Sequence, residues 1–196
     1  MKKLIAIALT LVMLCGAVAV LADTGLATPS KTTDDLANFE VTVENPVDGK
    51  VVAIIPVGDS AEEAVKYKDI LEAAASELEK AQAAGSAEAY FGGDTAKAIT
   101  DILGADAEIS LDELLAVYAV GYEEGMGSAT VAVQVATPYE KGENVAAMIG
   151  FVENNNVTWN VFEGFGLEDG RVQLTVPADV MLALMNGSAL FAICSK

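Results

Sequence analysis

Apolar and polar residues alternate over residues 39–44, FEVTVE, in the pattern of a strand that buries one face. Turn-forming Pro, Asp and Gly residues follow at positions 46–49. The apolar run 50–57 then predicts a second strand that is buried on both faces. We therefore expect order to begin near Asn38.

A long helix is predicted next, from a capping box formed by Ser60 and Glu63 to a glycine stop at Gly85. Its apolar residues step by four and three along the chain and form one stripe: Tyr67, Leu71, Ala74, Leu78 and Ala81. A second helix is predicted over residues 94–103, with Asp94 as its cap and a glycine directly after it.

Residues 110–122 carry two competing patterns. Ser110 and Glu113 fit a further capping box, whereas residues 116–122, AVYAVGY, are rich in strand-forming residues. We predict a short helical turn that gives way to a strand.

From Ser128 onward the pattern is that of antiparallel strands. Alternating or continuous apolar runs predict strands at residues 131–135, 145–152, 158–165, 172–176 and 189–194. Tight turns are predicted at 154–156 and 169–170, because Asn and Gly tolerate a positive φ. Pro177 opens a short helix before the last strand.

The order of these elements predicts an α+β fold, with two to three helices mainly in the N-terminal half and an antiparallel, β-rich C-terminal half. The strands would form either a sandwich-like arrangement or one twisted sheet with helices on one side. We expect three parts: a signal peptide at 1–22, a flexible leader at 23–37 and a single globular unit at 38–196, with 38–106 and 107–196 as its natural sub-divisions. The strand pattern of the second half resembles that of small sandwich modules in secreted Gram-positive proteins, a likeness that assigns no functional residue.

The N-terminal segment has the three parts of a bacterial secretory signal. Lys2 and Lys3 provide the positive end, an apolar run follows over residues 4–14, and small side chains lead to a cleavage site before Asp23. Two alternatives stay open: the segment is long enough to be retained as a membrane anchor, or it is lipidated at Cys15. In each case the sequence predicts a protein that is secreted or exposed on the extracellular face of the cell envelope.

The chain has a formal net charge of −18, and removal of the two signal lysines makes it about −20. Such a surface repels nucleic acid and anionic lipid headgroups. We therefore expect no nucleic-acid partner, and membrane contact only through an uncleaved N-terminal segment. After cleavage Cys194 is the only cysteine, so no intramolecular disulfide is expected, and its apolar neighbours predict a buried thiol.

The chain contains no histidine, which excludes Ser-His and Cys-His nucleophiles and metal sites with histidine ligands. The sequence also has no glycine-rich phosphate loop and no Ser-x-x-Lys motif of the penicillin-recognising enzymes. We therefore predict a protein without a cofactor that is not an enzyme.

Acidic residues are the remaining candidates for chemistry. Asp23-Thr24-Gly25 matches the aspartic-protease triplet, but it begins the expected mature chain and has no second copy. Four carboxylate pairs occur where a leader, a helix start or a turn is expected: Asp34-Asp35, Glu62-Glu63, Glu123-Glu124 and Glu168-Asp169. Calcium is the metal that oxygen-rich turns favour, and its candidate turns are 48–49 and 153–156, without the spacing of an EF-hand.

Three aromatic residues, Trp159, Phe162 and Phe165, form the candidate binding patch. Strand alternation places Trp159 and Phe165 on one face and Phe162 on the other. The ordinary role of such residues is in the core or in a subunit contact, and the alternative is an exposed surface for a ligand.

These patterns favour a non-catalytic secreted or cell-surface protein, a binding or interaction module whose partner is a protein or a cell-surface polymer. The first alternative is a small hydrolase that uses carboxylates only. The second is a calcium-stabilised structural protein.

Overall fold

The computed structural model of the protein describes residues 38–58, 60–105, 108–135, 138–154 and 156–196. The expected signal peptide and leader lie outside these residues, and so do Cys15, the triplet at 23–25 and the acid pair at 34–35. Within the described residues, no helix is both long enough and apolar enough to cross a membrane.

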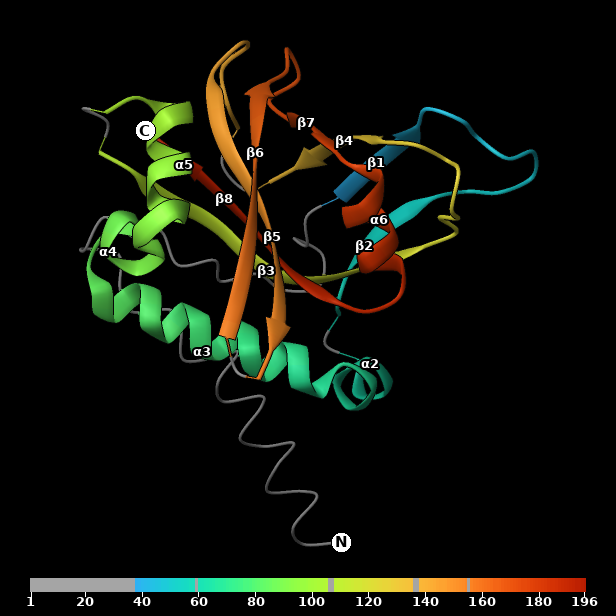
Figure 1. Cartoon of the computed structure of the whole chain (residues 1–196), viewed down its shortest axis with the longest axis horizontal. Helices are drawn as coiled ribbons and strands as arrows, with labels where there is room; N and C mark the ends of the chain where they lie inside the picture. Colours follow the sequence, from blue (N-terminus) through green and yellow to red (C-terminus); the bar gives the residue numbers. More distant parts are fainter. Residues whose placement is uncertain (1–37, 59, 106–107, 136–137, 155) are drawn as a thin grey trace, which may run out of the picture.

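Eight antiparallel strands form one sheet that curves until it is nearly barrel-shaped (Figure 1). In chain order they are β1 (Asn38–Val43), β2 (Ala53–Pro56), β3 (Ser110–Val120), β4 (Ala129–Gln134), β5 (Asn144–Glu153), β6 (Asn156–Gly166), β7 (Val172–Val176) and β8 (Ala189–Ser195). Their order across the sheet is β1-β4-β7-β6-β5-β8-β3-β2. The end strands β1 and β2 lie side by side, so the sheet comes back on itself.

The first strand is confirmed, but the second differs from its prediction. Phe39 and Val43 are buried, while Glu40 and Thr42 point to solvent. The second strand occupies only four residues of the predicted run 50–57 and is only partly buried. β1 hydrogen-bonds to β4 and β2 to β3, so no ladder joins β1 to β2 in the described sheet.

Five helices are described: α2 (Ala61–Lys66), α3 (Lys68–Ala84), α4 (Ala87–Phe91), α5 (Gly93–Leu103) and α6 (Ala178–Met185). α3 contacts β3 and β8, α5 contacts β5 and β6, and the short α4 connects the two helices (Figure 1). These three helices therefore cover one outer face of the sheet. α6 is the described helix that belongs to the strand-rich C-terminal half.

The predicted long helix is interrupted at Tyr67, which separates α2 from α3. Its ends are as predicted: Ser60 Oγ accepts a hydrogen bond from the N–H of Glu63, and Gly85 ends α3 with a φ of 73°. The predicted apolar stripe packs against the sheet. Because the apolar spacing continues through the interruption, the sequence does not reveal it.

The short helix α4 was not expected, because its five residues are too few to display a helical period. The side chain of Ser86 caps it by accepting a hydrogen bond from the N–H of Ala89. α5 begins one residue earlier than predicted, with Gly92 rather than Asp94 at its cap position.

The helical turn predicted at Ser110 is wrong, because this residue begins strand β3. β3 pairs with β8, and its register shifts between Leu111 and Glu113 through a β-bulge. The hydroxyl of Ser110 donates to Asp112 Oδ1 instead of capping a helix. Pairing with a fully buried strand outweighs the local capping pattern.

The sheet separates two hydrophobic cores. The inner core lies within the curve, where residues of the strands meet the apolar side of α6. The outer core lies between the sheet and the helices α3, α4 and α5. β8 contributes to both cores: Phe191 and Ile193 lie in the inner core, and Leu190 and Cys194 lie in the outer core. Burial on both faces explains why the central strands are apolar runs instead of alternating ones.

The prediction of an α+β fold with a strand-rich C-terminal half is confirmed. The strands form one continuous curved sheet, which corresponds to the twisted-sheet form of that prediction. The expected turns lie between β5 and β6, where Asn154 has a φ of 50°, and between β6 and β7. α6 begins directly after Pro177, as predicted.

Candidate functional site

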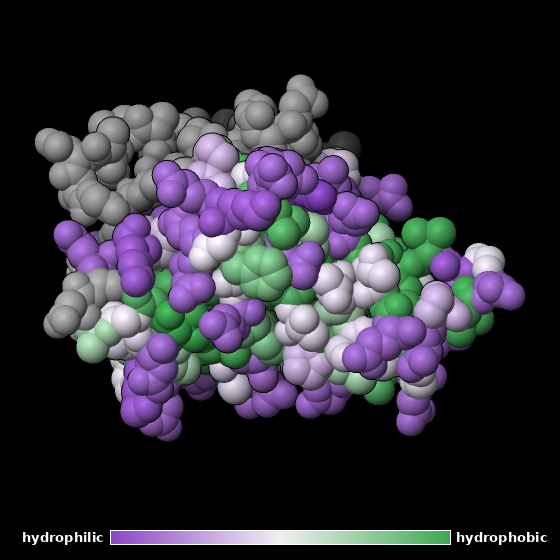
Figure 2. Space-filling model, turned by 90° about the horizontal axis from the view of Figure 1, so that it is seen from above, coloured by the Kyte–Doolittle hydropathy of each residue, from purple (hydrophilic) through white to green (hydrophobic). Residues whose placement is uncertain are grey.

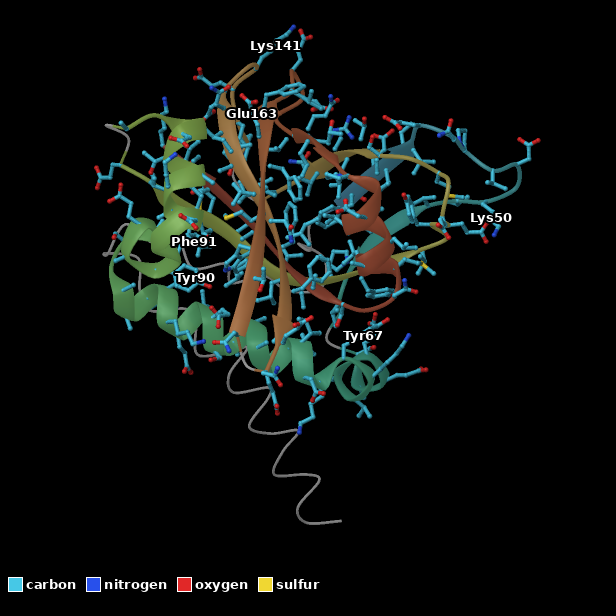
Figure 3. All side chains as sticks on the ribbon, in the orientation of Figure 1. Lys50, Tyr67, Tyr90, Phe91, Lys141 and Glu163 are labelled. Carbon is cyan, nitrogen blue, oxygen red and sulfur yellow. The ribbon has the colours of Figure 1, made fainter. Side chains whose placement is uncertain are left out.

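Lys66, Tyr67 and Tyr118 meet where α2 ends and α3 begins, at the place where Figure 3 labels Tyr67. We call these three residues the tyrosine–lysine patch. The two tyrosine rings are stacked, with centroids 4.7 Å apart and planes inclined by 19°. Lys66 Nζ lies 4.7 Å from the ring centroid of Tyr67 and 5.7 Å from that of Tyr118. Both distances are within the reach of a cation–π interaction, about 6 Å.

The break between α2 and α3 positions the patch. Tyr67 has a φ of −111° and a ψ of 25°, away from regular helical values, although its N–H still donates to the carbonyl of Glu63. α3 restarts at once, because the N–H of Leu71 donates to the carbonyl of Tyr67. Lys66 therefore ends one helix and Tyr67 precedes the next, and both side chains reach Tyr118.

Tyr118 comes from the outer face of β3 and lies opposite Ile55 of the end strand β2. The patch therefore sits beside the line where the sheet comes back on itself. Tyr67, Tyr118 and Ile55 are half-buried, and Lys66 is exposed. Packing therefore holds the rings in place but leaves part of their surface accessible.

The surroundings keep Tyr118 and Lys66 in their ordinary charge states. Burial, followed by the neighbouring Tyr67 and Glu63, raises the pKa of Tyr118, and contact with Tyr67 raises the pKa of Lys66. At neutral pH the Tyr118 phenol is therefore neutral and the ammonium is charged. A neutral ring face beside an ammonium group is an arrangement that binds cations, and it contains no activated nucleophile or general base.

Acidic residues outnumber lysines around the patch. Residues 60–72 carry four carboxylates and two lysines. One of these lysines, Lys68, pairs with Glu72 at 3.4 Å. Glu62 and Glu63 lie in the first turn of α2, on the short helix that also carries Lys66. The local field around the rings is therefore negative.

Two valines on the segments that carry this region are largely exposed. Val65 on α2 is 80% exposed, and Val51, just ahead of β2, is 81% exposed. Val51 belongs to the loop of residues 44–52, which projects from the molecule (Figure 1). Figure 2 shows hydrophobic residues at this projecting end of a face on which hydrophobic and hydrophilic residues are mixed. Single exposed valines are ordinary, but Val65 lies two residues before Tyr67, so it adds exposed apolar surface to the helix that leads into the patch.

The projecting loop is braced by the loop between β3 and β4. Ser128 donates from its N–H and from Oγ to the carboxylate of Glu44. Lys50, labelled on this loop in Figure 3, pairs with Glu123 of the other loop. The exposed apolar surface is thus presented by a loop with defined hydrogen bonds.

The three aromatic residues singled out from the sequence do not share one surface. Trp159 faces outward from β6 and meets Phe91 of α4 edge to face, with ring centroids 5.5 Å apart. Phe162 lies on the other face of β6 and packs against the inner core. Phe165 is on the face of Trp159 and is 43% exposed. Trp159 and Phe162 therefore have core contacts, and ligand binding by this group stays a prediction.

A second polar cluster lies at the start of β3, beside its bulge. Asp112 accepts hydrogen bonds from the hydroxyls of Ser110 and Tyr139, the latter at 2.7 Å. Ser195 Oγ lies 3.4 Å from Ser110 Oγ, and Glu113, next in the chain, is buried. Burial and the neighbouring Asp112 raise the pKa of Tyr139. Both carboxylate oxygens of Asp112 are engaged by the chain itself, which ties the loop after β4 to β3.

The described carboxylate pairs lie at a helix start and in two turns: Glu62-Glu63 in α2, Glu123-Glu124 after β3 and Glu168-Asp169 after β6. Several of these acids form ion pairs, such as Asp169 with Arg171 at 2.8 Å and Glu168 with Lys141 at 3.2 Å. Among the residues that the structure describes, no group of three or more His, Cys, Asp or Glu side chains is arranged to hold a metal ion.

The sequence alone does not reveal the tyrosine–lysine patch. Tyr67 is expected there as a member of an apolar helical stripe, and Tyr118 as part of a segment with an ambiguous pattern. Only the packing of α3 on β3 brings the two rings together, and residue spacing carries no sign of that contact. The one local signal is a lysine directly before the first residue of the stripe.

Comparisons with protein-family models, with curated proteins and with solved structures found no match for this chain. Its function is therefore inferred from its own residues, which combine aromatic, apolar and charged surface at the tyrosine–lysine patch.

Proposed function

We propose that this protein is a non-catalytic module, secreted or held on the extracellular face of the cell envelope, that binds another protein through the tyrosine–lysine patch. The observation that carries the proposal is the stack of two half-buried tyrosines beside the end strand of the sheet, with the exposed Val65 on the helix that leads into the stack and the exposed Val51 on the loop that leads into that strand. Aromatic side chains within a rim of charged residues are typical of protein interfaces. Tyrosine is favoured there because it presents a large surface at low entropic cost.

The rigidity of the surface supports the same role. Tyr118 is held in a strand that pairs on both sides, with β2 and with β8. Tyr67 is held between two helices by its own backbone hydrogen bonds. Because little has to be ordered on binding, more of the contact energy is retained as affinity.

Export places the partner outside the cytoplasm, and the intact mass of the native product tests this expectation. Residues 1–22 have the pattern of a signal peptide. A product that begins at Asp23 in the culture medium supports release, and a product in the membrane fraction with its N-terminus intact, or with a lipid on Cys15, supports an anchored form. A product that accumulates in the cytoplasm contradicts the proposal.

Binding is tested with the exported protein, labelled with a fluorophore, and intact cells of the producing organism. The double variant Val51→Ser/Val65→Ser and the single variant Tyr118→Leu should each lower the bound fluorescence several-fold. Lys97→Ala, on the exposed side of α5, is the control and should bind as the unmodified protein does. Equal binding by all variants contradicts the proposal, and binding that survives protease treatment of the cells assigns the partner to a polymer instead.

A hydrolase that uses carboxylates only is the alternative. The feature that favours it is the cluster of Asp112, Glu113 and Tyr139, because β-bulges are often found next to active sites. Hydrolysis of a panel of glycans and peptides that is lost in Asp112→Asn and kept in Tyr118→Leu would support this alternative.

A calcium-stabilised structural protein is the second alternative. Its candidate turns, 48–49 and 153–156, both connect consecutive strands. A melting temperature that falls when the exported protein is treated with a chelator would support it.

A further inference from the structure

We propose that the stacked rings of Tyr67 and Tyr118 form a binding site for a cationic side chain, a lysine or an arginine in a basic segment of the partner, and that Lys66 occupies this site in the free protein. The inference rests on the proposed function and specifies the chemistry of its partner.

Lys66 demonstrates what the ring faces accept. Its ammonium group stands over Tyr67, with the centroid 4.7 Å away, and 5.7 Å from the centroid of Tyr118. Within the described part of the chain, Lys66 forms no ion pair with a carboxylate, in contrast to Lys68, which pairs with Glu72. The Lys66 ammonium is therefore positioned by the Tyr67 side chain, by its hydroxyl as well as its ring, and a second ammonium or a guanidinium of similar size fits the same place.

Displacement of Lys66 by an incoming cation costs little. Lys66 is exposed at the last position of a short helix, and its long side chain has other rotamers in solvent. An exposed cation–π contact is weak, so it does not lock the lysine over the rings. A partner's cation would bring further contacts with it, because Ile55 lies opposite Tyr118 and is partly exposed, and Val65, two residues before Tyr67, is largely exposed.

The charge of the surrounding surface selects a basic partner. Residues 44–52, 60–72 and 121–128 together carry eight carboxylates and three lysines, in a chain with a net charge of −18. Such a field raises the local concentration of cationic segments and repels anionic ones. An acidic ligand would meet eight carboxylates and three lysines, two of which already pair with Glu123 and Glu72.

The first test asks whether peptide binding depends on the presence of Lys66 at the tyrosine rings or only on the net charge of the protein. The probes are fluorescein-labelled octalysine and octaarginine peptides, titrated with the exported protein at about 0.15 M salt, where remote charges are screened. Lys66→Ala vacates the rings, and Lys68→Ala makes the same change in net charge without touching them. We expect Lys66→Ala to bind the peptides about three- to tenfold more tightly than Lys68→Ala. An octaglutamate peptide should bind to neither variant.

The second test separates the ring face from apolar bulk, in the background of Lys66→Ala. Tyr118→Phe keeps an aromatic ring, whereas Tyr118→Leu keeps apolar volume without one. We expect unchanged affinity for the first variant and about a three- to tenfold loss for the second. The emission of Trp159, the single tryptophan, and an unchanged melting temperature establish that each variant is folded.

Equal affinities of Lys66→Ala and Lys68→Ala, together with no loss in Tyr118→Leu, would overturn the inference, and so would an absence of peptide binding to Lys66→Ala. If either of these results overturned the cation site, loss of cell binding in Val51→Ser/Val65→Ser would still support the proposed function. Tyrosine-dependent peptide binding without any binding to cells would uphold the cation site and contradict the proposed function. Tighter binding of a neutral oligosaccharide than of either peptide would overturn the cationic partner.

Discussion

Tyr90 of α4 donates a hydrogen bond of 2.8 Å from its hydroxyl to Oε2 of Glu77 on α3. Glu77 is only 7% exposed, and Lys80 donates to its other carboxylate oxygen. Tyr90 also contacts the ring of Phe91 (Figure 3). Phe91 in turn meets Trp159 of the sheet. A buried carboxylate with two partners thus fastens the helical layer over the outer core.

Replacing Tyr90 by Phe should lower the free energy of unfolding by about 1.5–3 kcal/mol, because a hydrogen bond to a charged group is lost and the carboxylate stays buried. Chemical denaturation followed by the emission of Trp159 measures the change. Lys97→Ala, which removes an exposed ion pair with Asp101, is the control and should leave the stability almost unchanged. Equal effects of the two substitutions would show that the Tyr90–Glu77 bond contributes no more than a surface pair.

Tyr139 and Cys194 should make the fold sensitive to alkaline pH. Burial, followed by the neighbouring Asp112, raises the pKa of both groups above their ordinary values of 10.0 and 9.0. Above these values the unfolded chain loses protons that the folded chain keeps. The stability is therefore fully present below about pH 9 and falls as the pH rises, by up to about 1.4 kcal/mol per pH unit for each group.

Urea denaturation between about pH 8 and pH 11 measures this dependence. The double variant Tyr139→Phe/Cys194→Ala should show a flatter decline, because neither side chain can then ionise in the unfolded state. The readout is the slope with pH, which the loss of the hydrogen bond to Asp112 does not alter. An unchanged slope in the double variant would contradict the assignment.

Gly121→Ala should destabilise the projecting loop more than Gly125→Ala does. Both glycines have a positive φ, 75° and 96°, but a Cβ on Gly121 would lie 2.1 Å from the carbonyl oxygen of Val51, whereas one on Gly125 would meet no atom within 4 Å. Gly125→Ala therefore carries backbone strain of about 1–2 kcal/mol, and Gly121→Ala should cost at least about 2 kcal/mol more in the free energy of unfolding. Equal costs in urea denaturation would contradict this close approach.

Gly150→Ala should displace Trp159 from its site beneath α4. A Cβ on Gly150 would lie 2.7 Å from the indole ring and 2.6 Å from a methyl group of Val157. Contact between the indole and Phe91 would weaken, and the emission should shift to longer wavelength as water reaches the ring. Gly142→Ala is the control, because a Cβ there meets nothing within 4 Å. Unchanged emission in Gly150→Ala would mean that the neighbouring side chains absorb the added methyl group.

Short-range chemistry made part of the fold predictable from the sequence. The cap at Ser60, the stop at Gly85, the turn at Asn154 and the helix start at Pro177 each depend on dihedral angles or hydrogen bonds within a few residues. The strand order is different, because it depends on which apolar faces meet after long excursions of the chain. β8 lies between β5 and β3, and β1 lies beside β4, arrangements that periodicity does not encode.

Two misassigned segments have a common physical cause. Ser110 and Glu113 satisfy a capping pattern, but β8 offers that segment backbone hydrogen bonds within a buried sheet. Tyr67 continues an apolar stripe, yet the helix is interrupted there, where its ring stacks on Tyr118. In each case a tertiary partner outweighs the local preference. The candidate site is made from such a tertiary contact, so the sequence alone does not reveal it.

β1 and β2 are the two ends of the sheet and also consecutive strands of the chain. Within the described sheet, each of these strands has a hydrogen-bonded neighbour on one side only. The sheet is therefore held closed by side-chain contacts and by the braced loop, because no continuous ladder of hydrogen bonds joins its two ends. The sheet therefore has a seam, along which it would unroll before any paired strands separate. Amide hydrogens that face this seam should exchange with deuterium ahead of those between β5 and β8.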